Sequence, residues 1–338
     1  MGAAWMSRRA VISTLSEIVG YKSGLALNRA QILGHLARQG NRFYGRDDDG
    51  LRIRSEEFEE MVSQLLYRVG VVDSPVNMPP GIALFHQYKK DAKALDLSNK
   101  VQQLFMDMFD QLMQSAEQSG TKRIDPEPYL DEAMRLYGPA GCLMSIEFIK
   151  LLAESQEHSP WGKIRQVDWK DTRELDDLFK SEHLATQYGE FFDQRFVTYL
   201  ERNFNDIDQV HWRQFEGLTA EFFDRLGFHV EVGPGRKDGG VDIRIWPTTG
   251  QQDKPPTVLI QCKRQKATVE QVVVKALYAD VSHESASAGL IVTTSRLAKG
   301  AVAVNSARSY PIGEANRKTL KVWVEAMRTP GSGVFLGE

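Results

Sequence analysis

The period of the apolar and polar positions changes near residue 205. Before this point apolar residues recur at steps of three and four, which is typical of amphipathic helices. The clearest runs lie between 101 and 112 and between 191 and 204. After it, short segments alternate apolar and polar residues with a period of two, which is typical of strands. The pattern predicts a mostly helical N-terminal region and a C-terminal domain that mixes helices and strands.

The order of the C-terminal segments indicates a fold class. We expect helices near 211–228, 269–281 and 297–309, and strands near 228–232, 241–246, 257–264, 289–294 and 320–324. The first three strands follow one another as hairpins, and helices separate the later ones. This order predicts an α/β/α domain with a mixed sheet over residues 205–338. The whole chain, with its helical N-terminal region, would be a multidomain protein of the α+β and α/β classes.

Prolines divide the N-terminal region. Residues 73–84 begin with DSPVNMPPG, which predicts a linker because proline removes a backbone donor and keeps the preceding residue extended. Residues 1–72 predict a small domain of helix, arginine-bearing loop or hairpin, and helix. A winged-helix-like module that touches phosphates and a small helical domain with a solvated charged face both fit this pattern. Residues 85–204 predict a helical scaffold or oligomerisation region.

Composition excludes several classes of protein. The chain has 338 residues, 42% of them apolar, with 42 Lys or Arg against 45 Asp or Glu and only two cysteines. These values argue against a disulfide-stapled, collagen-like or wholly disordered chain. No apolar run reaches the roughly 18 residues that a membrane helix needs, so we expect a cytoplasmic protein without a membrane partner.

The net charge of −3 hides an asymmetry. The first 54 residues hold nine basic and four acidic residues, a net charge of +5, and residues 205–338 hold 17 basic and 15 acidic residues, a net charge of +2. The acidic residues are concentrated in the helical middle. The total charge therefore does not argue against a nucleic-acid partner.

Two expected strands place polar residues on one face. Alternation puts Val241 and Ile243 on one side of their strand and Asp242 on the other. In the strand that follows, Gln261 and Lys263 share a face. If the two strands pair as a hairpin, a carboxylate, an amide and an amine converge at their ends.

The helix before these strands adds a second carboxylate. Glu216 lines up with Ala220, Phe223 and Gly227, which are small or apolar. A charged side chain in such a row must be paired or bound to a metal ion, because burying it alone is costly.

This set of side chains suits phosphodiester hydrolysis. Mg²⁺ prefers oxygen ligands, which Asp242, the Gln261 amide and the Cys262 backbone carbonyl can offer, with Glu216 as a compensating carboxylate. Lys263 can position or deprotonate a water molecule and stabilise developing charge. Asp238 is a further possible ligand, although aspartate before two glycines more often serves the turn.

Four segments in this order carry a family resemblance. They are FEGLTAEFFDRLGFHVEV (215–232), GRKDGGVDIRI (235–245), VLIQCKR (258–264) and GLIVTTS (289–295). Together they resemble the catalytic domain of Mrr-like restriction endonucleases, a branch of the PD-(D/E)xK nuclease superfamily in which QxK often replaces D/ExK. The resemblance covers roughly residues 205–310. One departure is a longer, proline-rich loop at 247–256.

The resemblance implies both an activity and a site. Asp242 and Gln261 would belong to the metal site, Lys263 would be the catalytic lysine, and Glu216 would support the metal, with Mg²⁺ as the cofactor and Mn²⁺ as a substitute. DNA would be the substrate, in defence against foreign DNA. Double-strand cleavage by a single-site domain implies a homodimer or higher oligomer, for which the long amphipathic helices offer an interface.

Basic residues flank the expected site, and other functions stay open. Arg236, Lys237, Arg264 and Lys266 would suit phosphate contacts, although each alone is more often a solvated surface residue. The neutral Gln261 also permits a non-catalytic DNA-binding or scaffold subunit. An effector nuclease that a partner activates, such as a sensor NTPase, is another alternative; no Walker motif is present, so ATP dependence would come from that partner.

Overall fold

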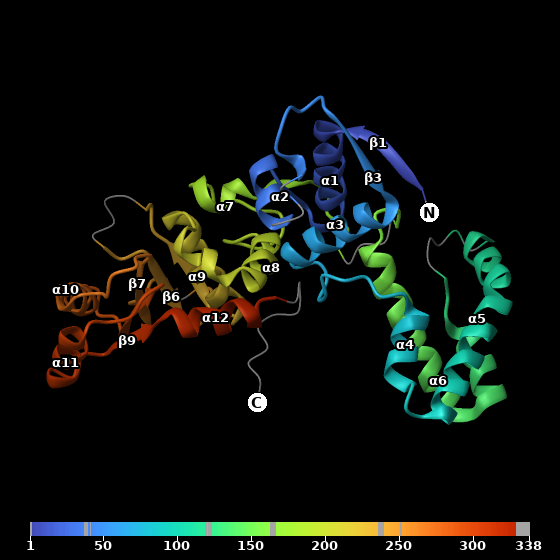
Figure 1. Cartoon of the computed structure of the whole chain (residues 1–338). Coiled ribbons are helices and arrows are strands. Elements are labelled where there is room, and N and C mark those ends of the chain that lie inside the picture. The colour runs from blue at the N-terminus through green and yellow to red at the C-terminus, as the bar shows by residue number, and fades with distance from the viewer. Residues whose placement is uncertain are drawn as a thin grey trace. The chain divides into compact units, whose positions relative to one another are not determined.

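A computed structural model describes residues 2–36, 40, 42–118, 120, 124–162, 167–235, 240–250 and 252–328 (Figure 1). The chain forms two compact units, each built from several segments. The first contains Met1–Ile18, His35–Tyr67 and Val72–Asp168, and the second contains Val19–Gly34, Arg68–Val71 and Trp169–Glu338.

The second unit contains a five-stranded mixed sheet in the order β5-β6-β7-β8-β9. Its strands are β5 (His229–Val232), β6 (Ile243–Trp246), β7 (Val258–Lys263), β8 (Ala288–Thr293) and β9 (Ile312–Ala315). The first three pair antiparallel, with Ile243 opposite Ile260, and the last three are parallel. The predicted hairpin succession and mixed sheet are confirmed.

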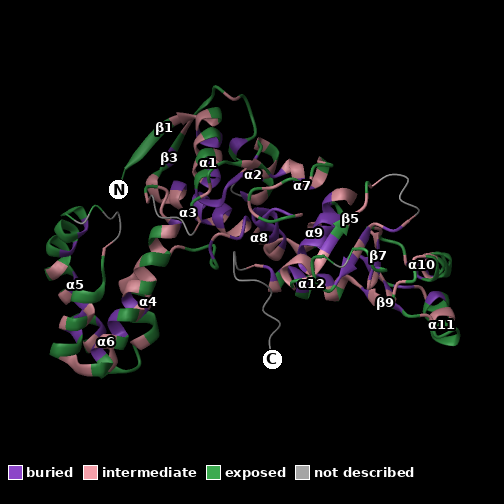
Figure 2. Cartoon of the chain, turned by 180° about the vertical axis from the view of Figure 1, so that it is seen from behind, coloured by how far each residue is buried: buried purple, intermediate pink, exposed green. Residues whose placement is uncertain are grey.

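Helices cover both faces of this sheet. They are α9 (Trp212–Arg225), α10 (Gln271–His283), α11 (Lys299–Ala307) and α12 (Arg317–Ala326). Leu259 of β7 packs in one core cluster with Leu277 of α10 and Ala301 of α11. On the other face, Cys262 of β7 contacts Thr219 of α9, and residues 214–222 of that helix are all buried (Figure 2). Apolar burial on both faces is the expected source of stability in a layered α/β/α domain.

The prediction of a strand near 320–324 was wrong. This segment lies in α12, where Leu320, Trp323 and Val324 are buried at helical spacing, Val322 is exposed, and the Asn316 side chain accepts a hydrogen bond from Lys318 N. The last strand is β9 instead, a short segment with glycine and glutamate that lacks a strong strand pattern. Flanking valines made five residues of a helix resemble an alternating strand.

Short elements complete the second unit. They are β2 (Leu25–Ala26), β4 (Arg173–Glu174), α7 (Asp176–Lys180), α8 (Gln194–Arg202) and the 3₁₀ helix η2 (Phe204–Asp208). Strands β2 and β4 pair in parallel. Asp193 caps α8 and forms a buried ion pair with Arg195 at 2.7 Å, and Arg195 also donates to the Gly24 carbonyl at 3.2 Å. This pair joins segments that are far apart in sequence.

The first unit pairs its N-terminus with a distant strand. Strand β1 (Ala3–Ser7) pairs antiparallel with β3 (Gly50–Arg54), and helix α3 (Ser55–Arg68) follows directly. Helix α1 (Arg8–Ser23) and helix α2 (Arg29–Leu36) lie between the strands in sequence and belong in part to each unit. The arginine-bearing segment therefore contributes one strand to a long-range pair and does not form a local hairpin.

Three helices follow α3 in the described part of the first unit. Helices α4 (Pro80–Tyr88), α5 (Ala92–Gln118) and α6 (Glu127–His158) share a core that includes Leu84 and Phe105. The predicted long amphipathic helix is confirmed by α5. Helix α6 begins within the proline-containing segment DPEP (125–128) and ends at HSP (158–160), because proline disfavours a helix interior.

Helix α6 is the one described helix that is long and apolar enough to cross a membrane. Gly138 interrupts it with φ of 68° and ψ of −164°, followed by Pro139. Tyr129 and Phe148, on either side of this break, pack into the core with Phe105. Since core helices of helical bundles have the same length and composition, this feature is weak evidence for a membrane span.

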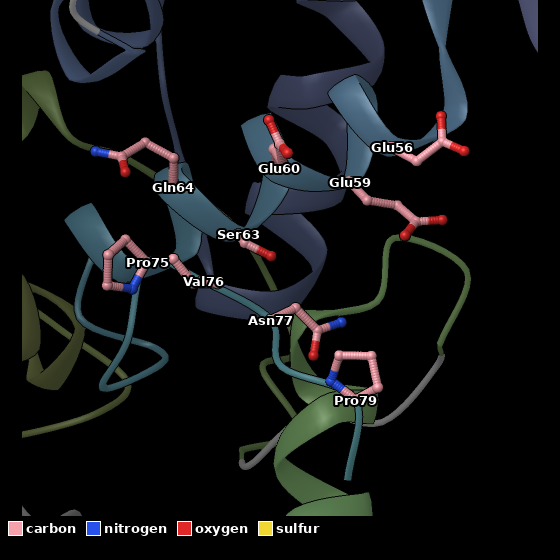
Figure 3. A pocket seen from close by; sticks show the side chains of 9 residues that line it. All are labelled: Glu56, Glu59, Glu60, Ser63, Gln64, Pro75, Val76, Asn77 and Pro79. Atoms are coloured by element: carbon pink, nitrogen blue, oxygen red, sulfur yellow. The ribbon is translucent and has the colours of Figure 1, made fainter. Parts of the chain in front are cut away.

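A cavity of about 410 Å³ lies in the first unit, between α3 and the proline-rich segment that follows it (Figure 3). Glu56, Glu59 and Glu60 of α3 line one side, and Asn77 and Pro79 line the other. Three carboxylates repel phosphate, so this face of the small N-terminal region is unsuited to a DNA backbone.

Candidate active site at the junction of β6 and β7

Asp242 lies immediately before β6 and is tied to the neighbouring strand. Its backbone N–H donates to the Ile260 carbonyl at 2.9 Å, and its side-chain Oδ2 accepts a hydrogen bond from the Cys262 N–H at 2.6 Å. Antiparallel pairing of β6 with β7 therefore brings this carboxylate beside the Gln-Cys-Lys segment. A short hydrogen bond to a charged acceptor holds the carboxylate in one orientation.

Gln261 presents an oxygen acceptor that has no hydrogen-bond partner. The residue is 7% exposed, and its Oε1 is buried without a partner among the described residues. A buried acceptor that stays unsatisfied costs roughly 1–3 kcal/mol, so such an atom calls for a ligand, an ion or a water molecule. Gly240, with φ of 98°, leaves the amide room, because a Cβ there would lie 3.0 Å from Gln261 Nε2.

Lys263 ends β7 and shares a strand face with Gln261. Its side chain is half-buried, and its backbone carbonyl accepts a hydrogen bond from the Thr293 hydroxyl at 2.8 Å. This bond anchors the end of β7 to β8 just where the strand finishes. The amine is therefore carried by a backbone that two neighbouring strands hold.

Cys262 points to the opposite face of β7, toward α9. Its Sγ lies 3.7 Å from the Thr219 hydroxyl. Burial raises the pKa of this thiol well above its usual value, and the negative charges of Asp242 and Glu216 raise it further. The side chain is therefore a neutral thiol at physiological pH, and only its backbone carbonyl is a candidate ligand.

Glu216 is buried and paired. Its side chain is 7% exposed, and its Oε2 lies 2.8 Å from Arg213 Nη1, one turn earlier on α9. The same guanidinium nitrogen donates to the Gly233 carbonyl at 2.8 Å, and Gly233 N–H donates to the Asp242 carbonyl at 2.8 Å. Arg213 therefore links the helix acid to the turn that precedes Asp242.

The structure brings Asp242, Gln261 and Lys263 to the same strand junction, as alternation predicted. Within the residues that the structure describes, no three His, Cys, Asp or Glu side chains are close enough to hold a metal ion together. The expected ligand set has only two carboxylates, and its other oxygens come from an amide and a backbone carbonyl. The candidate set thus combines few charges with neutral oxygen donors.

The four expected phosphate-binding residues differ in their placement. Arg236 and Lys237 lie outside the described residues, as does Asp238. Arg264 is exposed and donates to the Asp208 carbonyl at 2.9 Å, and Lys266 is exposed in the segment after β7. Their contacts with DNA stay predictions.

Sequence reasoning missed two residues that shape the site. Arg213 neutralises Glu216, and an arginine three positions before a helix glutamate is a signal that could have revealed it. Gly240 leaves space for the Gln261 amide, whereas the Asp-Gly-Gly sequence around it indicates only a turn. Both act by positioning other groups.

Comparison with known proteins matches the C-terminal part of the chain to a family. Residues 207–324 match the model Mrr_cat, described as "Restriction endonuclease". "Uncharacterized protein y4cE" from Sinorhizobium fredii (strain NBRC 101917 / NGR234) is 33% identical over 88 residues, which is 26% of this chain and 22% of that protein. The chain therefore matches about a fifth of the length of this curated relative.

A solved structure shows a weaker likeness. "MspJI Restriction Endonuclease in Complex with 27-mer Oligonucleotide" aligns with a TM-score of 0.30 at 17% identity, over 54% of this chain and 39% of that chain. A TM-score of this size supports no argument of its own. Residues 207–324, which contain this sheet, helix α9 and the Asp242 to Cys262 contact, therefore match the restriction endonuclease domain model Mrr_cat.

Proposed function

We propose that this domain hydrolyses phosphodiester bonds of DNA with the help of a divalent cation. The cation would be Mg²⁺, for which Mn²⁺ could substitute. One observation carries the proposal: a carboxylate fixed by the Cys262 N–H lies beside Gln261, whose buried Oε1 has no partner among the described residues. Structural packing alone leaves that acceptor unexplained, because buried polar atoms are normally satisfied. An oxygen-seeking cation would satisfy it.

The residues present fit such an ion. Asp242 Oδ1 or Oδ2, Gln261 Oε1 and the Cys262 carbonyl are oxygen donors of the kind that Mg²⁺ binds together with water and phosphate. Glu216, which is balanced by Arg213, would be the second carboxylate of the set. When bound, the cation would polarise the phosphate and lower the pKa of a coordinated water molecule.

Lys263 would act on the reacting groups directly. In hydrolysis the water oxygen bonds to phosphorus, one bridging P–O bond breaks, and the leaving oxygen takes up a proton. An ammonium group at the end of β7 can orient the attacking water and offset charge on the phosphate oxygens. The hydrogen bond from Thr293 to its backbone carbonyl fixes the end of the strand that carries it.

Cleavage of plasmid and phage DNA by the full chain with Mg²⁺ tests this proposal. Asp242→Ala and Lys263→Ala should each lower the cleavage rate at least about 100-fold, since each removes a group that acts in the transition state. Lys275→Ala, which removes an exposed lysine of α10 in the same domain, should cut like the wild type. Equal cutting by all four proteins would overturn the proposal.

A non-catalytic DNA-binding or scaffold role is the second candidate. It is favoured by the neutral Gln261 and by the small number of carboxylates close to the site within the described residues. Calorimetric titration with Mn²⁺ separates the two roles. If the site is catalytic, the wild type should bind Mn²⁺ and Asp242→Ala should not. If the protein is a scaffold, the heat of the titration should be the same for both proteins.

We also propose that the protein acts in the cytoplasm, in defence against foreign DNA, as a homodimer or higher oligomer. Two copies would place one site on each strand of a duplex, and a partner such as a sensor NTPase could control them. Phage plating efficiency on cells that express the wild type or Asp242→Ala tests the defence role. Sedimentation of the full chain tests the oligomer, and a monomer that makes double-strand breaks would contradict it.

A further inference from the structure

A second cavity, of about 440 Å³, lies in the C-terminal unit between α8, η2 and α12. Its lining includes Arg202, Phe204, Asn205, Arg317, Lys318 and Lys321. Four of these side chains are cationic, and Glu201 is the one acid among the described lining residues. Arg202 lies 3.9 Å from Glu201 and Arg317 pairs with Asp208 at 2.6 Å, so Lys318 and Lys321 supply most of the positive excess, which suits an anionic ligand.

The cavity lies at the same end of the sheet as the candidate active site. Strands β7, β8 and β9 are parallel, so their carboxyl ends share one edge. Lys263 ends β7 at this edge, and α12 starts at Arg317 immediately after β9. Arg317 N–H donates to the Ser295 carbonyl at 3.4 Å, just beyond the end of β8. In sheets with parallel strands, ligands bind at this edge.

One residue joins the two sites. The Asp208 carbonyl accepts a hydrogen bond from Arg264 at 2.9 Å, and its carboxylate accepts one from Arg317 at 2.6 Å. Arg264 follows the candidate catalytic Lys263 directly in the chain. Asp208 therefore forms hydrogen bonds with both Arg264, which follows β7, and Arg317, which lines the cavity.

Arg317 is held in place before any ligand binds. Besides its ion pair with Asp208, it donates to Asn205 Oδ1 at 3.2 Å, and its guanidinium lies 5.3 Å from the centre of the Phe204 ring. Since the side chain is already ordered, binding an anion there costs less conformational entropy.

The two lysines of α12 are accessible. Lys318 and Lys321 are exposed, and Lys321 makes one exposed contact with Glu325 at 3.6 Å, of the type that contributes little. Helix α12 contacts α8, which carries Arg202. Basic side chains from two helices therefore border one open surface, which suits an extended polyanion better than a single small ion.

We infer that Arg202, Arg317, Lys318 and Lys321 form a phosphate-binding surface for the backbone of the DNA duplex that flanks the cleaved bond. This inference rests on the proposed nuclease function. The surface would set the register of the duplex relative to Lys263 without reading bases, because phosphate contacts position a duplex and base contacts specify it.

Binding of a fluorescent 30-base-pair duplex to the full chain, followed by anisotropy over a KCl series, tests the surface. Lys318→Ala/Lys321→Ala should weaken binding on the order of tenfold. It should also reduce the slope of log K against log[salt] by about 2, since each phosphate contact contributes about 0.9. Lys318→Arg/Lys321→Arg keeps both charges and should bind like the wild type.

Lys275→Ala/Lys299→Ala is the matched control, because it removes two exposed lysines of the same domain outside the cavity. It should leave affinity and slope unchanged. Equal weakening by both double alanine variants, or by neither, would overturn the inference. The inference would also be overturned if Lys318→Ala/Lys321→Ala lost binding of inorganic phosphate but still bound the duplex like the wild type.

The same samples separate this inference from the proposed function. If the wild type cuts DNA and Lys318→Ala/Lys321→Ala binds and cuts equally well, the surface is disproved and the nuclease stands. If the wild type binds the duplex without cutting it and the variant loses binding, the surface stands and the nuclease proposal fails. A melting temperature equal to that of the wild type shows that the variant is folded.

Discussion

Asp242 Oδ2 accepts a 2.6 Å hydrogen bond from the backbone N–H of Cys262. The carboxylate therefore contacts the strand segment that carries Gln261 and Lys263, although 20 residues separate the two partners. This hydrogen bond thus has a structural and a chemical consequence. It gives a backbone N–H of β7 its acceptor, and it fixes the orientation of the Asp242 carboxylate in the candidate active site.

Two substitutions at Asp242 separate these consequences. Asp242→Asn keeps an oxygen for the Cys262 N–H and removes the charge, so we expect a stable protein with at least about 100-fold slower DNA cleavage. Asp242→Ala also removes the acceptor and should lower the free energy of unfolding by roughly 1–2 kcal/mol more than Asp242→Asn. Urea unfolding and plasmid cleavage measure the two effects, and full activity in Asp242→Asn would contradict the assigned role.

Gln261→Glu should strengthen cation binding. The change puts a carboxylate where the amide oxygen now lies with no partner in the described part of the chain, and added ligand charge raises the affinity of oxygen sites for divalent ions. We expect Mn²⁺ to bind on the order of tenfold more tightly in calorimetry. Without the ion, the variant should be less stable than the wild type, because it buries a second charge beside Asp242. Unchanged Mn²⁺ affinity would remove Gln261 from the ligand set.

Arg213→Ala should destabilise the C-terminal domain. It breaks the ion pair with the buried Glu216 and removes a donor to the Gly233 carbonyl, which together should lower the free energy of unfolding by about 3 kcal/mol. Thermal unfolding measures the loss. Arg135→Ala, which breaks an exposed pair with Glu132 on α6, is the control and should unfold like the wild type. Equal stability of both variants would show that the buried pair contributes little.

The Asp193 to Arg195 pair predicts a pH dependence of stability. Burial alone would raise the pKa of Asp193, but hydrogen bonds and the charge of Arg195 outweigh it and hold the pKa below the ordinary value of 3.8. A carboxyl group whose pKa is lowered by folding stabilises the protein fully above its unfolded pKa, and this stabilisation is lost as the pH falls through the folded pKa.

Asp193→Asn should therefore cost about 3–5 kcal/mol at pH 7, because it leaves the buried Arg195 charge without its carboxylate partner. The difference in the free energy of unfolding between Asp193→Asn and the wild type should become smaller as the pH falls from 4 to 2. Urea unfolding at pH 7, 5 and 3 measures it. A difference that stays constant to pH 2 would mean that Asp193 keeps the same pKa in the folded and unfolded states.

Cys262 should react slowly with thiol reagents in the native protein. Burial, reinforced by the charge of Asp242, raises its pKa well above 9.0, so the reactive thiolate is scarce at pH 8. In a Cys142→Ala background, we expect modification by N-ethylmaleimide at least about tenfold slower than in urea. Mass spectrometry of timed samples measures the rate, and equal rates would show that the thiol is accessible and ionised.

Local patterns predicted the parts of this fold that depend on local periodicity. The alternation of VDIRIW and TVLIQCKR placed Asp242, Gln261 and Lys263 correctly, because side chains of a strand point to opposite faces whatever the strand pairs with. Long helices such as α5 were predictable for the same reason. The same reasoning failed at α12, where a five-residue window cannot separate a helix from a strand.

The amino-acid sequence by itself determined the family resemblance of the C-terminal domain and the strand faces on which its candidate residues lie. Only the tertiary structure decided which groups meet: Asp242 with the Cys262 N–H, Glu216 with Arg213, and Arg264 and Arg317 with Asp208, the last pair across 109 residues. Periodicity reports which side of an element is buried. The partner of a polar atom depends instead on strand register and chain closure, which involve residues far apart in the sequence.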